Sequence, residues 1–273
     1  MTSGIDATAD GALEDIAYLS RSANRVGVLD ALATGAHTRR ELMTATDVSR
    51  TTLGRILNEL AERGWAERTT NGDYVATPTG EHVVREFLPS VEAMNAIRSL
   101  DGAVAWLPTE ELSIGLHHFG DATVRRSEPN APVEPGRRLA ELLRDASTFA
   151  TLTYFSPPLA VGRAMREGVV HGELSAEHVL AGGLVGYLRE RPDDPPGWRE
   201  YVDAGARVYR YDGHIPCNLF VVDETVLVPN DRAHTKHPGV AIETENETVR
   251  SWAHGLIETY RADAQRVDAE TFA

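Results

Sequence analysis

The alternation of apolar and polar positions divides the chain into two differently patterned parts. In the first part, apolar side chains recur every three or four residues, which predicts helices, and two short β-prone runs follow them. From about position 100 onward, β-rich stretches alternate with helical ones, which is typical of an α/β domain. We therefore expect an α+β protein of two domains joined by a helix. The expected bounds are 1–80 for the first domain, 81–107 for a linker or dimerisation helix, and 108–273 for the second domain.

The segment that begins at Thr38 has the layout of a helix-turn-helix. Thr38 is a natural N-cap, and Glu41 three residues later completes a capping box for a short first helix. A second helix is expected over 49–63, opened by Ser49 and closed by Gly64 just past its end. Its buried face consists of apolar residues at helical spacing, namely Leu53, Ile56, Leu57 and Leu60.

Two β-prone runs within 65–77 flank Asn71-Gly72, a dipeptide typical of type I′ hairpin turns, which need positive φ at both positions. A hairpin after a helix-turn-helix is a wing, so the segment predicts a winged helix-turn-helix that binds double-stranded DNA. The recognition helix 49–63 would read the major groove, and the wing would contact the backbone or the minor groove. The residues expected to contact DNA are Thr38, Arg39, Ser49, Arg50, Thr51, Thr52, Arg55, Asn58, Arg68 and Asn71. The alternative is a small helical subdomain with an ordinary exposed arginine face.

An apolar stripe continues into the linker, where Val91, Met94, Ile97 and Leu100 follow one another at spacings of three. Pro89 is expected to break the helix here or to start a new one. Both a core contact and a dimer seam fit such a stripe. A homodimer is expected on general grounds, because many operators have two-fold symmetry.

The second domain is expected to form a sheet with helices. The expected strands are 122–125, 148–155, 169–174, 206–211, 218–222 and 225–228, and the expected helices are 136–145, 158–167, 176–190, 197–204 and 249–267. Ligands of such sheets bind beyond the carboxyl ends of strands. This rule predicts a site for a small metabolite, made by Tyr154, Ser156, Glu173, Tyr211, His214 and Asp223.

The overall charge is the opposite of what a DNA-binding protein usually has. The formal net charge is −14, although residues 22–75 balance seven arginines against seven acidic residues. Of 27 basic residues, only Lys236 is a lysine. Acid excess with arginine in place of lysine resembles proteins of extreme halophiles, and a GC-rich genome is the alternative. In molar salt the Debye length is about 3 Å, so direct hydrogen bonds from Arg50 or Arg55 to bases would carry more of the affinity.

Several classes of protein are excluded by what the sequence lacks. No apolar run approaches the roughly 18 residues that span a membrane, and no segment resembles a signal peptide, so we expect a cytoplasmic protein. The single Cys217 excludes an internal disulfide and a multi-cysteine metal site. The histidine pairs His117/His118 and His234/His237 lack an acid cluster and are interpreted as surface residues. We expect no metal and no cofactor.

The chain resembles a known family over nearly its whole length. Its first domain, on RTTLGRILNELAERGW and TPTGEHV, is similar to helix-turn-helix regulators of haloarchaea and methanogens. The rest resembles the C-terminal domain of methanogenesis-regulatory-type proteins, on AWLP (105–108), DATVRRSEPNAP (121–132), YRYDGHIPCNLFVVDETVLV (209–228) and VRSWAHGLIETYRADA (249–264). The resemblance implies a transcriptional regulator with a C-terminal effector or dimerisation domain. That domain in turn looks like a degenerate half of a phospholipase D fold, as in TrmB-like archaeal regulators.

The same resemblance allows a test for enzymatic activity. An active phospholipase D half carries His-x-Lys followed by an aspartate. Here His214-Ile-Pro216 stands in its place without a lysine, and Asp223 lies two residues beyond the expected position. The other His-x-Lys, at 234–236, has no acid at the right spacing. We therefore expect no enzyme. The first function expected is a DNA-binding regulator that senses a small metabolite; the alternatives are a regulator or adaptor whose C-terminal domain only mediates assembly or protein contacts, and a degenerate nuclease.

Overall fold

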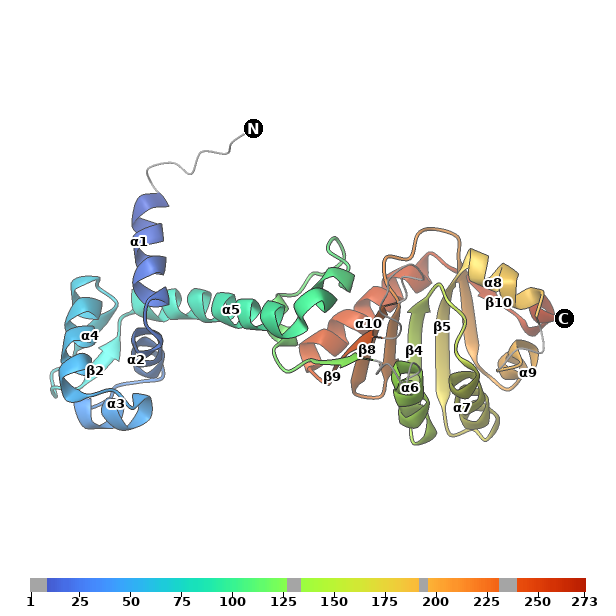
Figure 1. The fold of residues 1–273 in the computed structure, drawn as a ribbon, viewed down its shortest axis with the longest axis horizontal. Coiled ribbons are helices and arrows are strands. Elements are labelled where there is room, and N and C mark those ends of the chain that lie inside the picture. The colour runs from blue at the N-terminus through green and yellow to red at the C-terminus, as the bar shows by residue number, and fades with distance from the viewer. Residues whose placement is uncertain (1–8, 127–133, 192–195, 231–239) are drawn as a thin grey trace. The chain divides into compact units, whose positions relative to one another are not determined.

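The computed structural model describes residues 9–126, 134–191, 196–230 and 240–273 (Figure 1). The chain forms two compact units, Met1–Glu92 and Ala93–Ala273. The boundary falls within helix α5 (Pro78–Leu100), inside the segment that the sequence assigns to a linker. Because the first unit is mainly helical and the second contains a large mixed sheet, the expected α+β class is confirmed.

The N-terminal unit packs four helices and a hairpin ahead of α5 within the described residues. These elements are α1 (Ala9–Ser20), α2 (Ala23–Ala33), α3 (Arg39–Thr46), α4 (Arg50–Glu62), β1 (Ala66–Arg68) and β2 (Tyr74–Ala76). The four apolar residues expected on the inner face of the second helix, from Leu53 to Leu60, are each at most 1% exposed. The hydrophobic spacing therefore predicted the core of the helix-turn-helix correctly.

The predicted caps of the two helices are confirmed. The hydroxyl of Thr38 accepts a hydrogen bond from the backbone N–H of Glu41 (3.2 Å), and the Glu41 carboxylate accepts one from the backbone N–H of Thr38 (2.8 Å). The bonds from the Thr38 backbone and hydroxyl hold the pKa of Glu41 below its usual value. The Ser49 hydroxyl accepts from the N–H of Thr52 (3.3 Å), and Gly64 follows α4 with φ of 72°. Both ends of the expected recognition helix are therefore set by local sequence.

The turn of the hairpin differs from the expectation. Gly72 has positive φ (93°), but Asn71 is not among the residues with positive φ, so the turn is not type I′. The N–H of Gly72 donates to the Thr69 carbonyl (3.0 Å), and the N–H of Thr69 donates to that of Asp73 (2.8 Å). The loop therefore holds three residues, as in a type I turn followed by a glycine bulge.

Helix α5 starts earlier than the expected 81–107 and ends earlier, at Leu100, where the turn Asp101–Trp106 follows it. It begins at Pro78, where proline fits because the first helical N–H has no partner inside the helix. Thr77 caps it, since its hydroxyl accepts from the N–H of Gly80 (3.1 Å) and its carbonyl from that of Glu81 (2.9 Å). The expectation that Pro89 breaks the helix is wrong, because Pro89 lies inside α5.

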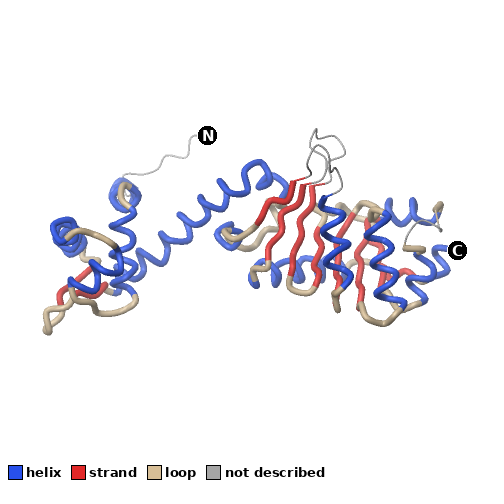
Figure 2. Tube along the Cα trace, turned by 60° about the horizontal axis from the view of Figure 1, so that its bottom comes forward, coloured by secondary structure: helices blue, strands red, loops and turns tan. Residues whose placement is uncertain are grey.

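The C-terminal unit is built on a mixed sheet of eight strands within the described residues. In the order in which they lie side by side, they are β10 (Gln265–Val267), β6 (Arg207–Tyr211), β5 (Ser175–Ala181), β4 (Thr148–Thr153), β7 (Leu219–Val222), β8 (Thr225–Asn230), β9 (Val240–Thr244) and β3 (Thr123–Arg126) (Figure 2). Strands β4, β5 and β6 are parallel, and each remaining pairing is antiparallel. The carboxyl ends of β4, β5 and β6 therefore meet at one edge of the sheet, where β7 begins.

Both faces of this sheet are covered. The core of one face includes residues of α6 (Glu134–Arg144), α7 (Leu159–Val170), α8 (Gly182–Arg189), α9 (Trp198–Asp203) and the turn η3 (Ala269–Phe272). The core of the other includes residues of α10 (Glu247–Ala262) and the turns η1 (Asp101–Trp106) and η2 (Leu116–Phe119) (Figure 1). Along β7, Phe220 and Val222 belong to the first core, and Leu219 and Val221 to the second. A strand buried on both faces reads as a continuous apolar run.

One predicted strand and part of one predicted helix are wrong. The segment 169–174, expected as a strand, contains the end of α7 and a turn through Gly172, whose φ is 74°. The expected helix 176–190 contains β5 in its first half and α8 in its second. Strand β5 lies in the middle of the sheet and is largely buried on both sides, so it shows no alternation that would separate it from a buried helix. Strands β9 and β10 were not predicted.

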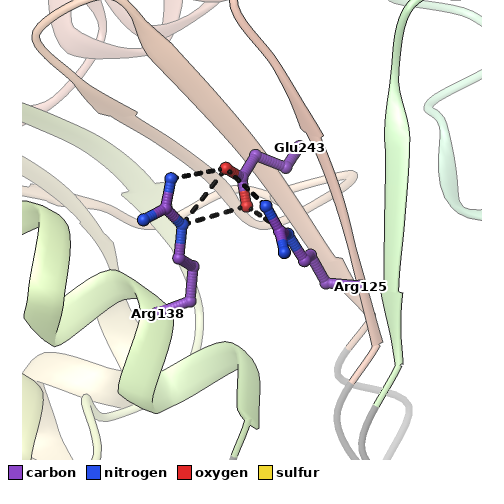
Figure 3. Close-up of polar contacts among 3 residues, drawn as sticks. All are labelled: Arg125, Arg138 and Glu243. Atoms are coloured by element: carbon purple, nitrogen blue, oxygen red, sulfur yellow. Dashed lines mark hydrogen bonds and ion pairs between the residues drawn. The ribbon is translucent and has the colours of Figure 1, made fainter.

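A buried carboxylate ties the edge of the sheet to α6. Glu243 of β9, 7% exposed, accepts hydrogen bonds from Nε of Arg125 (2.8 Å) on β3 and from Nη2 of Arg138 (2.8 Å) on α6 (Figure 3). Burial alone would raise the pKa of Glu243, but the hydrogen bonds from Arg138 and Arg125 outweigh it and lower the pKa. The ionised carboxylate therefore joins two strands and a helix.

Candidate nucleic-acid interface

The outer face of α4 carries hydrogen-bond donors that point away from the core. Arg50, Thr51, Arg55 and Asn58 are exposed, whereas Thr52 is half-buried and its N–H is used in the helix cap. Arg50 makes no polar contact with the described residues. This face presents the groups that recognise base edges and phosphates.

Arg55 has a neighbour on its own helix. Its Nε lies 4.0 Å from a carboxylate oxygen of Glu59, four residues on, and Glu59 also contacts Arg25 of α2 at 3.2 Å. The Arg55 side chain is 65% exposed, so the pair is a surface one that binding to a phosphate or base could replace.

The wing is joined to the start of α3 through Tyr74. His37 forms an isolated β-bridge with Tyr74, with both N–H···O distances at 2.8 Å. The Tyr74 hydroxyl accepts from Nε and Nη2 of Arg39 (3.2 and 2.8 Å), and the guanidinium carbons of Arg39 and Arg68 lie 5.3 and 5.8 Å from its ring centroid. Arg68 also donates to the carbonyl of Gly72 (3.0 Å) within the hairpin. Two arginines expected to contact DNA, Arg39 and Arg68, therefore both lie near the ring of Tyr74.

The remaining residues expected at the interface lie on the surface of the same unit. Thr38, Ser49 and Asn71 are exposed, and Thr38 and Ser49 also cap helices. Sequence reasoning missed Tyr74 and His37. The signal for Tyr74 was its position at the start of the second β-prone run, directly opposite Arg68.

The six residues expected to bind a metabolite do not lie together. Tyr154 and Ser156 follow the carboxyl end of β4, Tyr211 ends β6, and His214 lies in the loop that leads to β7. Tyr211 packs its ring against Tyr260 of α10, with centroids 5.0 Å apart. These four are therefore near one edge of the sheet.

Glu173 and Asp223 lie at the opposite edge of the sheet. Glu173 precedes β5, so its expected place at a strand end followed from the wrong strand prediction. Asp223, with φ of 47°, turns the chain between β7 and β8, and its carboxylate accepts from the N–H groups of Ser147 (3.2 Å) and Thr148 (2.8 Å). Asp223 therefore closes a turn at the amino end of β4.

A polar hollow of about 390 Å³ lies where β4 ends and β7 begins, and Tyr154 and His214 both line it. Asn218, 1% exposed, lies at its wall and accepts with Oδ1 from the Thr153 hydroxyl (2.8 Å) and the Tyr154 N–H (3.0 Å). Its Nδ2 has no hydrogen-bond partner among the described residues. Cys217 beside it is buried, and burial, with a smaller contribution from Glu111, raises the pKa of its thiol to about 12.

A larger and mostly apolar cavity of about 510 Å³ lies between the sheet and helices α6, α7 and α9. The side chain of His178, which lines this cavity, is hydrogen-bonded to two hydroxyl groups. His178, 1% exposed, is 2.9 Å from the Thr151 hydroxyl through Nδ1 and 2.8 Å from the Tyr201 hydroxyl through Nε2. Burial lowers the pKa of His178 to about 3, so this imidazole is neutral at physiological pH. Sequence reasoning identified none of these three residues.

Two other properties concern the described part of the chain alone. None of its helices combines the length and the apolar character that crossing a bilayer requires. Nor do its histidine, cysteine, aspartate and glutamate side chains gather in threes as a metal site would need. His234, Lys236 and His237 lie outside the described residues.

Comparisons with known proteins identify both parts of the chain. Residues 13–99 match the HVO_A0261 N-terminal domain, and residues 132–263 match the middle domain of the methanogenesis regulatory protein FilR1. No curated protein matches the chain. The two domain matches confirm the resemblance to archaeal helix-turn-helix regulators with a methanogenesis-regulatory-type C-terminal domain.

Solved structures similar to the chain include TrmBL2, an archaeal chromatin protein, at 15% identity and a TM-score of 0.43, covering 93% of this chain and 99% of that one. They also include the phospholipase D family member Nuc from Salmonella typhimurium, at 12% identity and a TM-score of 0.40, covering 54% of this chain and 99% of that one. NucT from Helicobacter pylori is 12% identical with a TM-score of 0.39, over 54% of this chain and 98% of that one.

Proposed function

We propose that this protein is a DNA-binding transcription regulator. Helix α4 reads the major groove of its operator, and the wing contacts the DNA backbone or the minor groove. The observation that carries the proposal is the exposed face of α4, where Arg50, Arg55 and Asn58 lie on a helix capped at both ends. The match of residues 132–263 to a domain of a regulatory protein supports the same function. Since the chain is acidic overall, specific hydrogen bonds rather than net charge would supply the affinity.

We further propose that the regulator acts as a homodimer. Large apolar side chains on two helices are exposed: Leu13 (49%) and Ile16 (52%) on α1, and Val91 (38%) and Met94 (62%) on α5. Exposed apolar residues on a helix favour a contact with a second copy. The finer proposal for the C-terminal unit is that it binds a small-molecule effector, for which the polar hollow and the apolar cavity described above provide room. The alternative is a unit that only mediates assembly.

The arrangement around His214 supports a regulator over a phosphodiesterase. In the phospholipase D reading, Asp223 would have to meet His214, yet the two lie at opposite edges of the sheet. The Asp223 carboxylate instead accepts hydrogen bonds from the backbone N–H groups of Ser147 and Thr148. The place of the phosphate-binding lysine has no cationic side chain, because Pro216 stands there.

Selection of DNA from a random pool by the purified full chain, in molar potassium chloride, tests the proposal. An enriched palindrome is expected, and fluorescence anisotropy then measures its affinity. Arg50→Ala or Arg55→Ala should weaken binding by about 1–3 kcal/mol if either makes a bidentate guanine contact. Arg85→Ala is the matched control, since Arg85 is a 64% exposed arginine of α5 outside the proposed interface. Unchanged affinity in both variants would remove α4 as the reader, and no enrichment at all would favour the assembly alternative.

A further inference from the structure

The larger cavity of the C-terminal unit has the size of a ligand site. Its volume of about 510 Å³ falls within the roughly 300–1,000 Å³ of small-molecule pockets. The sheet forms its floor, and α6 and α7 form its walls. Its exposed lining residues, Arg137, Pro158, Leu159 and Ala160, mark the mouth. The Glu243 contacts with Arg138 hold α6 against the sheet, so this wall is anchored.

The lining is rich in aromatic rings. Phe149, Phe155, Phe220 and Trp198 all face the cavity, together with aliphatic side chains such as Leu139 and Met165. The ring centroids of Phe155 and Phe220 are 5.7 Å apart at an interplanar angle of 75°, and those of Phe149 and Phe220 are 6.2 Å apart at 55°. Rings set at steep angles to one another offer edges and faces to a further planar ring.

A buried polar group in the same lining lacks a partner. Trp198 is 1% exposed, and its Nε1 is buried with no hydrogen-bond partner among the described residues. An unpaired buried N–H costs stability, which a ligand acceptor would restore. The neighbouring His178 is already paired on both ring nitrogens, so of these two buried rings only Trp198 keeps a donor without a partner among the described residues.

We propose that this cavity binds a planar aromatic small molecule with a single hydrogen-bond acceptor, which takes the indole N–H of Trp198. The site is separate from the polar hollow at Tyr154 and His214, and its lining would reject a sugar or another highly hydroxylated metabolite, whose polar groups would lose water without gaining partners. Binding itself does not depend on DNA recognition. The role of this ligand as the effector rests on the proposed function.

The first experiment titrates the full chain with the fluorescent probe N-phenyl-1-naphthylamine, which brightens in apolar surroundings. Saturable binding is expected. Ala160→Trp, at the mouth, should weaken it by at least 10-fold, whereas Arg163→Trp, an exposed position of the same helix outside the cavity, should leave it unchanged. No binding by the folded protein would overturn the proposal, and so would an equal loss in both variants.

The second experiment tests the ligand class and the role of Trp198. In competition against the probe, 2-methoxynaphthalene should displace it roughly 3- to 10-fold better than naphthalene, because its ether oxygen accepts the indole N–H. Trp198→Phe should abolish that preference while both compounds still bind. Displacement by laurate or glucose alone would overturn the aromatic assignment, and a preference that survives in Trp198→Phe would overturn the role of the indole.

Operator affinity measured in parallel separates the two proposals. Ligand binding with no DNA binding would contradict the proposed function and leave the cavity as a ligand site. DNA binding with no probe binding would overturn the ligand site and leave the proposed function standing. Both activities, with an operator affinity that shifts on addition of 2-methoxynaphthalene, would support the effector role.

Discussion

The hydroxyl of Tyr74 in the wing accepts two hydrogen bonds from the guanidinium of Arg39 at the start of α3, at 3.2 and 2.8 Å. The same tyrosine pairs its backbone with His37. One residue of the wing therefore fixes both the backbone that leads into the helix-turn-helix and an arginine proposed to contact DNA. A wing held in this way is pre-organised for binding.

Tyr74→Phe removes this acceptor and keeps the ring. We expect operator affinity to fall by about 0.5–1.5 kcal/mol, the usual net value of a hydrogen bond, because Arg39 is then free to leave its position. Fluorescence anisotropy on the selected operator measures the change. Tyr187→Phe, an exposed tyrosine of α8, is the control and should bind as wild type. Equal affinities for the two variants would show that the hydroxyl plays no part.

Gly80 marks a close approach that no other residue would tolerate. A Cβ at Gly80 would lie 2.0 Å from the carbonyl oxygen of Trp65, whereas one at Gly54, inside α4, would meet nothing within 4 Å. Gly80→Ala should therefore destabilise the N-terminal unit by about 2 kcal/mol or more, since backbone must move. Gly54→Ala should stabilise it by about 0.5–1 kcal/mol, as expected for alanine in a helix. Denaturant melts measure both, and a neutral Gly80→Ala would contradict the packing of α5 on Trp65.

Most of the N-terminal unit could be predicted from residues close together in the sequence. The capping box of Thr38 and Glu41, the cap at Ser49 and the glycine at position 64 are all decided by residues three or four apart, so the sequence predicted them correctly. The contact between Arg39 and Tyr74 joins residues 35 positions apart. Such a contact depends on how the wing folds back, which local periodicity does not contain.

The C-terminal unit was harder to predict, because its fold also depends on contacts between residues far apart in the sequence. Strand β5 was mistaken for a helix because a central strand buried on both faces has no period-2 pattern. The wrong strand at 169–174 placed Glu173, and with it part of the expected metabolite site, at the wrong edge of the sheet. His178 and Trp198 became recognisable only when β5 and α9 were brought to one cavity.

The carboxylate of Glu243 is the strongest candidate for a stabilising ion pair in this unit. Glu243→Gln keeps the shape of the side chain but removes the buried negative charge that Arg125 and Arg138 share, and we expect a loss of about 1–3 kcal/mol of unfolding free energy. Glu224→Gln is the matched control, because Glu224 is 81% exposed and 3.8 Å from Arg250, a surface pair of little value. Urea melts at neutral pH compare them, and equal stabilities would mean that the buried pair contributes nothing.

Burial of His178 makes stability depend on pH in a predictable direction. Its pKa falls from 6.5 to about 3 on folding, so between these values the unfolded chain binds a proton that the folded chain excludes. The contribution of neutral His178 to the free energy of unfolding is therefore fully present above pH 6.5. It is lost as the pH falls, at a rate that approaches about 1.4 kcal/mol per pH unit. Between pH 6.5 and 4.5 the wild type should lose about 2 kcal/mol more than His178→Gln, which does not titrate. Exposed His171→Gln should follow the wild type in the same denaturant melts. Parallel curves for the wild type and His178→Gln would contradict a neutral, buried imidazole.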